Sequence, residues 1–192
     1  MTCIVIHGFN SAPGRKSKLI QQAFPEAVVH SPKLKGNPIE DLQLLQNILD
    51  NSKNVHVVGT SLGAFYAMCL AVKNQSRLDC AYYAINPSIC PGDRFRTQLH
   101  QTFQNYKTNE VFQVTENFIE ELSSLQENLL SNFHLLKNIY FFLSMNDEVL
   151  EFDTLKNYID LYLVKYCIIE SEQSHRHEDI SDVLECMKEL TF

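Results

Sequence analysis

Ser61 is the residue of this chain whose surroundings most clearly predict chemistry. It is the centre of the stretch 59–63, Gly-Thr-Ser-Leu-Gly, which follows the apolar run Val-His-Val-Val at 55–58 and opens an apolar, helix-like segment. Gly-x-Ser-x-Gly between a strand and a helix is typical of the nucleophile elbow, a strained turn that exposes a serine hydroxyl above a sheet. The glycines leave room for backbone that packs against the turn. We predict that Ser61 is a nucleophile; the alternative is a serine that caps the helix.

A serine nucleophile needs a histidine base and an acid that orients it, and in this kind of fold the acid precedes the histidine along the chain. Acidic residues follow directly after the apolar run 139–143 (Ile-Tyr-Phe-Phe-Leu). Asp147 is the natural candidate and Glu148 the second choice, whereas Asp153 is expected to lie within the next helix. The alternative for Asp147 is a role in a turn or a helix cap.

The base is expected in the segment 170–179, which holds His175 and His177. His175 comes first after the preceding strand, which keeps it near the sheet edge where Asp147 should lie. Glu178 and Asp179 look like the start of the last helix, because carboxylates are favoured at a helix N-terminus. His177 should therefore turn away with that helix, and on this geometry we favour His175 as the base.

Two further readings of the same segment are weaker. His175, His177 and the two acids after them could ligate a metal, but no third histidine lies nearby in the sequence, so we expect neither a metal nor an organic cofactor. A solvated loop without chemistry is the other reading.

For an oxyanion hole we expect the backbone N–H groups of Leu62 and Phe9, while His7 should brace its loop by hydrogen bonds.

Short apolar runs alternate with amphipathic segments along the chain, which predicts a mainly parallel sheet of about six strands covered by helices on both faces. Strands are expected at 3–6, 27–30, 55–58, 80–85, 139–143 and 166–169. Helices are expected at 17–23, 39–49, 61–73, 152–163 and 180–190. Residues 91–133 contain helical patterning and no good strand. An insertion at this point should lie over the carboxyl ends of the strands, so we expect a helical cap; the alternative is a pair of helices on the side of the sheet.

Composition sets the limits within which these motifs act. The chain has 192 residues, 45% of them hydrophobic, so we expect one domain spanning residues 1–192. The formal net charge of −7 argues against nucleic acid and anionic membranes as partners. No basic leader or membrane-length apolar run is visible, and the six cysteines contain no Cys-x-x-Cys pair. We expect a cytoplasmic protein with reduced thiols.

Several of these motifs together resemble the small bacterial α/β-hydrolase esterases of the YqiA and YcfP type. The matching stretches begin at His7, Gly59, Ile85, Leu143 and Glu172: His-Gly-Phe-Asn-Ser, Gly-Thr-Ser-Leu-Gly, Ile-Asn-Pro, Leu-Ser-Met-Asn-Asp-Glu and Glu-Gln-Ser-His. The resemblance covers nearly the whole chain and is least good in residues 91–133. It implies a compact hydrolase that acts on short acyl esters, with Ser61 as nucleophile, Asp147 as acid and His175 as base.

Residues and resemblance together predict an α/β-hydrolase fold and a serine esterase that works through an acyl-enzyme on a small acyl ester or, second, a thioester. Two other classes of function stay open. One is a binding protein on a hydrolase scaffold with a silent site. The other is an interaction protein whose helices at 91–133 form a partner surface, which would require an exposed apolar stripe along Phe118, Leu122, Leu125 and Leu129.

Overall fold

The computed structural model describes residues 1–105, 107–150, 152–161 and 167–190. In this part of the chain six parallel strands form one sheet with the order β2-β1-β3-β4-β7-β8. The strands are β1 (Thr2–Ile6), β2 (Val28–His30), β3 (Val55–Thr60), β4 (Cys80–Ile85), β7 (Ile139–Asn146) and β8 (Cys167–Ser174). The predicted α/β fold with a parallel sheet of about six strands is confirmed.

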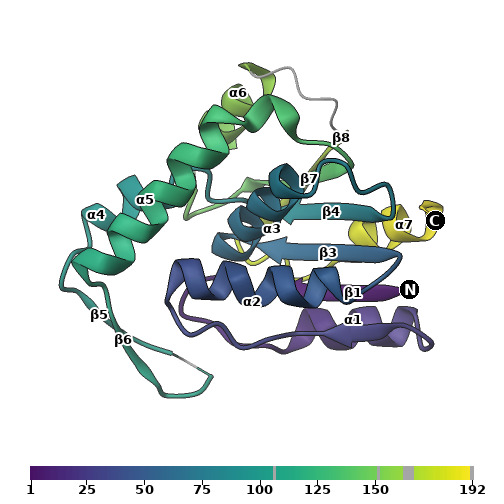
Figure 1. The fold of residues 1–192 in the computed structure, drawn as a ribbon, viewed down its shortest axis with the longest axis horizontal. Helices are drawn as coiled ribbons and strands as arrows, with labels where there is room; N and C mark the ends of the chain where they lie inside the picture. Colours follow the sequence, from purple (N-terminus) through teal and green to yellow (C-terminus); the bar gives the residue numbers. More distant parts are fainter. Residues whose placement is uncertain (106, 151, 162–166, 191–192) are drawn as a thin grey trace.

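Helices cover both faces of this sheet (Figure 1). One face packs against α1 (Arg15–Ala23) and α7 (Ser181–Glu189). The opposite face packs against α2 (Pro38–Asp50), α3 (Leu62–Lys73) and α6 (Phe152–Leu161). Side chains alternate along the strands, so Ile4 and Ile6 join the α2–α3 core while Cys3 and Val5 join the α1–α7 core. Burial on both faces explains why the strands read as continuous apolar runs.

Residues 91–133 lie beyond the carboxyl ends of β3 and β4 (Figure 1). They form α4 (Pro91–Arg96), the antiparallel hairpin of β5 (Thr102–Gln104) and β6 (Val111–Gln113), and α5 (Glu116–Ser131), and the short helix η1 (Phe133–Leu135) begins at their last residue. The expectation that this segment lacks strands was wrong. Each strand has three residues, with the central phenylalanine half-buried and its neighbours exposed, so neither is long enough to show an alternating apolar pattern.

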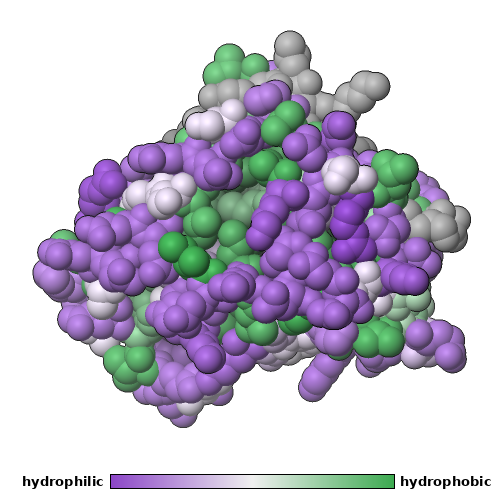
Figure 2. Space-filling model, viewed as in Figure 1, coloured by the Kyte–Doolittle hydropathy of each residue, from purple (hydrophilic) through white to green (hydrophobic). Residues whose placement is uncertain are grey.

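The apolar stripe of α5 faces the protein interior. Phe118, Leu122 and Leu129 are 2%, 0% and 1% exposed, and Leu125 packs against the same core. Figure 2 shows apolar side chains between α3 and α5 on a face that is otherwise mostly polar. Because the stripe is buried within the chain, it is not available as the partner surface that an interaction protein would need.

The last two strands of the sheet extend further than their apolar runs predict. β7 continues through Asn146 rather than ending at 143, and β8 continues through Ser174 rather than ending at 169. The polar ends of the two strands pair with each other, for example Ser144 with Ser171 and Asn146 with Ser174. Backbone pairing therefore continues where burial has ended, and it brings the segment after β8 beside the segment after β7. Residues 162–163 and 166 of the predicted elements lie outside the described residues.

No helix in the described ranges is long and apolar enough to cross a membrane.

Candidate active site

Ser61 occupies a strained turn between β3 and α3. Its φ of 56° and ψ of −119° lie outside the regions that residues with a side chain ordinarily adopt. A Cβ on Gly59 would stand 2.2 Å from the carbonyl oxygen of Gly63, and one on Gly63 would stand 2.3 Å from that of Ile6. Both glycines are therefore required by close backbone contacts, as the nucleophile-elbow motif predicts.

Neighbouring backbone holds the turn in place. The N–H of Ser61 donates to the carbonyl of Ile85, at the end of β4, with a distance of 2.9 Å. The carbonyl of Ser61 accepts from the N–H of Ser88 at 3.3 Å and from the first turn of α3. These bonds fix the strained conformation from two adjacent elements, so the hydroxyl is carried on a rigid support.

His175 and Asp147 form a close pair at the ends of β8 and β7. His175 Nδ1 lies 2.7 Å from Asp147 Oδ2, and the two side chains are 14% and 4% exposed. The other oxygen of Asp147 accepts from the N–H groups of Val149 and Leu150. Burial alone would raise the pKa of Asp147, but the hydrogen bonds from His175, Leu150 and Val149 outweigh it and leave that pKa below its ordinary value. An ionised Asp147 fixes the proton of His175 on Nδ1 and leaves Nε2 as an acceptor.

The second acid candidate contacts the backbone of the histidine rather than its ring. A carboxylate oxygen of Glu148 accepts from the N–H of His175 at 3.0 Å, and this hydrogen bond lowers the pKa of Glu148. Asp153 lies exposed in α6, as expected. Of the three acids, Asp147 is the one that orients the imidazole ring.

Ser61 and His175 line the same cavity, whose volume is about 360 Å³. Among the described residues no hydrogen bond joins the two side chains directly. In unliganded enzymes the bond between nucleophile and base is often long and shortens when substrate binds. The arrangement is therefore compatible with proton transfer from Ser61 to Nε2 of His175.

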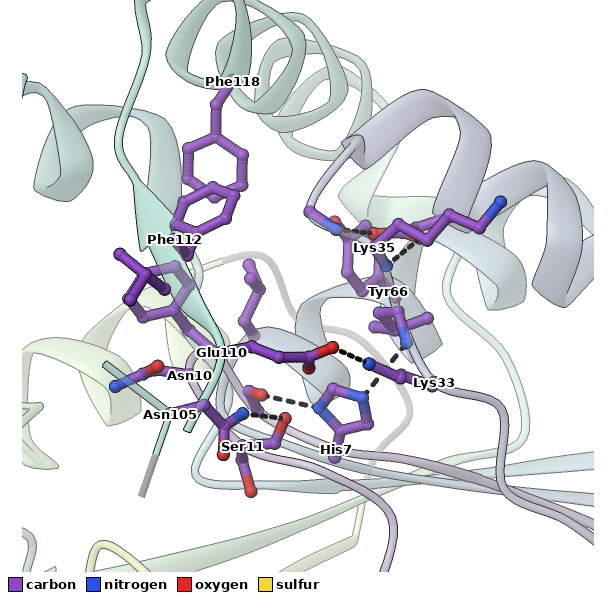
Figure 3. A pocket seen from close by; sticks show the side chains of 17 residues that line it. His7, Asn10, Ser11, Lys33, Lys35, Tyr66, Asn105, Glu110, Phe112 and Phe118 are labelled. Carbon is purple, nitrogen blue, oxygen red and sulfur yellow. Dashed lines mark hydrogen bonds and ion pairs between the residues drawn. The ribbon is translucent and has the colours of Figure 1, made fainter. Parts of the chain in front are cut away.

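A second cavity of about 460 Å³ shares His7, Gly8, Phe9 and Ser11 with the first. Figure 3 shows His7 within it, beside the ion pair of Lys33 and Glu110. His7 Nε2 accepts from the N–H of Leu34 at 3.2 Å, so Nδ1 carries the proton and donates to the carbonyl of Gly8 at 2.9 Å. Burial lowers the pKa of His7. The prediction that this histidine braces its loop by hydrogen bonds is confirmed.

The loop after β1 lies directly against the elbow, since a Cβ on Gly8 would stand 3.3 Å from Cβ of Ser61. Phe9, the next residue, anchors this loop with its ring. The ring packs against four aromatic rings, all of them from residues 91–133: Phe95, Phe103, Phe112 and Phe118. Phe9 and Leu62, the two residues expected to supply the oxyanion hole, both line the second cavity.

His177 faces the interior, where sequence reasoning did not place it. The residue is fully buried and its Nε2 lies 3.0 Å from Asp182 Oδ2. Since a carboxylate accepts only, Nε2 donates and Nδ1 accepts from the Ser144 hydroxyl at 3.0 Å. Ser144 Oγ in turn accepts from the side-chain amide of Asn86 at 2.9 Å, and that amide also donates to the carbonyl of His175 at 2.9 Å. A buried chain of hydrogen bonds thus supports the backbone of His175.

Within this chain of hydrogen bonds, Asn86 is the residue that the sequence could have singled out, because an Asn-Pro pair follows the apolar run at 80–85. It follows β4 directly, precedes a proline and has a φ of 43°, which asparagine tolerates better than most residues.

Within the described ranges no three side chains of His, Cys, Asp or Glu converge as ligands of a metal. Of the residues considered as metal ligands, the two histidines pair with Asp147 and Asp182, and Glu178 pairs with Arg15. Asp179 accepts a hydrogen bond from the N–H of Ser181.

Solved structures share this fold at low sequence identity. Est1E from Butyrivibrio proteoclasticus is 15% identical, with a TM-score of 0.73 over 98% of this chain and 85% of that one. Monoacylglycerol lipase from Paleococcus ferrophilus is 12% identical, with a TM-score of 0.75 over 97% and 93%. Mouse alpha/beta hydrolase domain-containing protein 10 is 15% identical, with a TM-score of 0.71 over 98% and 87%. These likenesses establish the α/β-hydrolase fold.

No curated protein matches the sequence. A family match, in contrast, extends over residues 2–192, which is nearly the whole chain. It agrees with the resemblance to the YqiA and YcfP type that the motifs indicated. The chain therefore belongs to the uncharacterised protein family UPF0227, and its fold is that of the α/β-hydrolases.

Proposed function

We propose that this protein is a serine hydrolase of small acyl esters, with thioesters as the second substrate class. The observation that carries the proposal is the Asp147–His175 pair, whose Oδ2 and Nδ1 atoms are 2.7 Å apart and whose histidine lines the same cavity as Ser61. The names of structural neighbours, a monoacylglycerol lipase and metagenome-derived lipolytic enzymes among them, support hydrolysis of this kind.

In the proposed reaction Ser61 Oγ attacks the carbonyl carbon of the ester while its proton moves to His175 Nε2. The imidazolium that forms is stabilised by ionised Asp147. The bond to the leaving alcohol or thiol then breaks, and that group takes the proton from Nε2. A water molecule reverses these steps on the acyl-enzyme, which releases the carboxylic acid and restores Ser61. The N–H groups of Phe9 and Leu62 are proposed to stabilise the oxyanion.

An activity-based probe separates this proposal from a silent binding protein. A fluorophosphonate reacts with an activated serine and should label the wild-type protein. Ser61→Ala should abolish labelling and lower turnover of p-nitrophenyl esters by roughly a thousandfold or more. Ser124→Ala, a change at an exposed serine of α5, is the matched control and should behave like wild type. An unlabelled wild-type protein without ester turnover would favour the silent binding protein.

A graded series of p-nitrophenyl esters would then define the acyl group. The apolar walls of the second cavity, formed by Phe9, Phe112 and Phe118, favour short to medium chains over acetate alone. A rate that is independent of chain length would argue that the acyl group does not enter that cavity.

A further inference from the structure

Positive charge is concentrated in the cavity that holds Ser61 and His175. Four of the chain's 16 Lys and Arg residues line it: Arg15, Lys16, Lys107 and Arg176. Glu178 is the one carboxylate among the described residues of its wall. The whole chain carries a formal net charge of −7, so the net charge of this cavity wall is opposite in sign to that of the protein.

Two of these cations lie where they oppose helix stability. Arg15 and Lys16 begin α1, whose first turn contains no acidic residue. The N-terminus of a helix is its positive end, so carboxylates are favoured there and cations are disfavoured. Conflicts between local stability and residue choice are typical of functional sites. Here the conflict would be relieved by an anion in the cavity.

The contacts of Arg15 and Lys16 differ in whether they neutralise the positive charge. Arg15 pairs with Glu178 at 2.8 Å, but the Nζ of Lys16 donates to the backbone carbonyl of Arg176 at 2.7 Å. A carbonyl accepts a hydrogen bond without neutralising the charge of its donor. Burial lowers the pKa of Lys16 to about 8, an effect opposed by Glu178 and reinforced by Lys107 and Arg15. A bound anion would favour the charged form of Lys16.

We propose that the substrate of this site carries an anionic group, a carboxylate or a phosphate, which binds in this cavity beside Lys16, Lys107 and Arg176. The proposal rests on the serine hydrolase function proposed above and specifies its substrate class. Hydrogen bonds to charged groups are stronger than those between neutral groups. We therefore expect the anionic group to raise kcat/KM by roughly tenfold or more over a neutral ester of similar shape.

Paired esters test this preference and locate the anion. Mono-p-nitrophenyl adipate against p-nitrophenyl hexanoate places a carboxylate on the acyl side, whereas 4-acetoxybenzoate against its methyl ester places one on the leaving group. 4-Acetoxyphenyl phosphate replaces that carboxylate with a phosphate. With each rate normalised to the ester's hydrolysis by hydroxide, the anionic member of at least one pair should be preferred, and high salt should weaken the preference. Equal values in every pair would overturn the proposal.

Lysine variants assign the preference to the cavity. Lys16→Gln removes the charge but keeps a hydrogen-bond donor, and it should lower the ratio of kcat/KM for the anionic over the neutral ester severalfold. Lys18→Gln is the matched control, because Lys18 is an exposed lysine of the same helix that does not line the cavity. It should leave both rates and their ratio unchanged. An unchanged ratio in Lys16→Gln would also overturn the proposal.

A binding measurement separates failure of this inference from failure of the proposed function. Calorimetry with the Ser61→Ala variant compares 4-acetoxybenzoate and 4-acetoxyphenyl phosphate with methyl 4-acetoxybenzoate in the absence of turnover. Tighter binding of either anion supports the cationic site even if the wild-type protein hydrolyses no ester. Neutral esters that are hydrolysed while no anion binds more tightly would leave a serine hydrolase without the anion site.

Discussion

Two imidazole–carboxylate pairs lie close together in this protein. They differ in the surroundings of the histidine nitrogen that does not contact the carboxylate. Asp147 binds His175 at 2.7 Å and Asp182 binds His177 at 3.0 Å. His175 opens on a cavity that Ser61 also lines. His177 is fully buried and turns its second nitrogen to the Ser144 hydroxyl, which is 1% exposed.

The buried pair therefore assembles serine, histidine and aspartate without the access that catalysis requires. Ser144 lies within the strand β7 and accepts a hydrogen bond from Asn86, whereas Ser61 lies in a strained turn that lines an open cavity. The comparison teaches that proximity of the three residue types does not identify a catalytic site. A histidine is a candidate base when its acceptor nitrogen faces both a nucleophile and enough space for a substrate.

The largest effect that distinguishes the pairs is expected from His175→Ala. Without the proposed base, ester turnover should fall on the order of 10⁶-fold, because loss of a catalytic histidine costs about as much as loss of the whole set. The variant should remain folded, because Asp147 keeps its hydrogen bonds from the N–H groups of Val149 and Leu150. Steady-state kinetics and a melting curve on the same preparation test both statements. Activity near wild type would remove His175 from the reaction.

Asp147→Asn should have the next largest effect, a loss of about 10³–10⁴-fold in kcat. The amide no longer fixes the imidazole proton on Nδ1, so Nε2 ceases to be a reliable acceptor. Circular dichroism establishes that the variant is folded. If turnover were lost equally in Asp182→Asn, the distinction between the two pairs would fail.

His177→Ala should act mainly on stability, with kcat within about tenfold of wild type. Removal of the ring leaves a cavity and takes a hydrogen-bond partner from the buried Ser144 hydroxyl and from the partly exposed Asp182 carboxylate, which costs about 2–4 kcal/mol of unfolding free energy. Denaturant unfolding measures this loss. His177→Asn is the milder variant, since asparagine tolerates the positive φ of 43° and can keep one hydrogen bond. A folded, fully stable His177→Ala protein would contradict the structural role.

Glu148→Gln should have the smallest effect, a few-fold at most in kcat. Its carboxylate contacts the backbone N–H of His175, and a glutamine oxygen can accept the same bond. The comparison of Glu148→Gln with Asp147→Asn in one assay tests which acid orients the ring. A larger loss in Glu148→Gln would move the acid by one position.

Much of the fold could be predicted because both faces of the sheet are buried. The apolar run at 80–85 marks β4 from end to end. The run at 55–58 stops two residues before β3 does, because the strand ends in Gly59 and Thr60, which carry no hydrophobic signal. The expectation that Asp147 and His175 would lie together followed from their places after two strands of one parallel sheet, since parallel strands end at the same edge, and from the family resemblance.

The features that the sequence could not predict depend on contacts between segments that are distant in sequence. The cations of the cavity that Ser61 and His175 line come from α1, from the segment at 91–133 and from the turn after β8, and nothing local in the sequence joins them. The burial of His177 likewise depends on Ser144 and Asn86, which are 33 and 91 residues away along the chain. Its neighbouring acids correctly indicated a nearby helix, but not that the ring would point inward.

The ring of Phe9 has a consequence for how this protein can diverge. Its four aromatic contacts all come from residues 91–133, the part of the chain that shapes the approach to Ser61. That segment and the loop carrying the proposed oxyanion donor form one packed unit, so they cannot be exchanged independently as modules. A chimera that imports only the segment from a relative would have to import a compatible residue 9 as well. Natural selection for a new substrate would face the same constraint, because each change in the aromatic cluster also alters the packing of the loop that carries the proposed oxyanion donor.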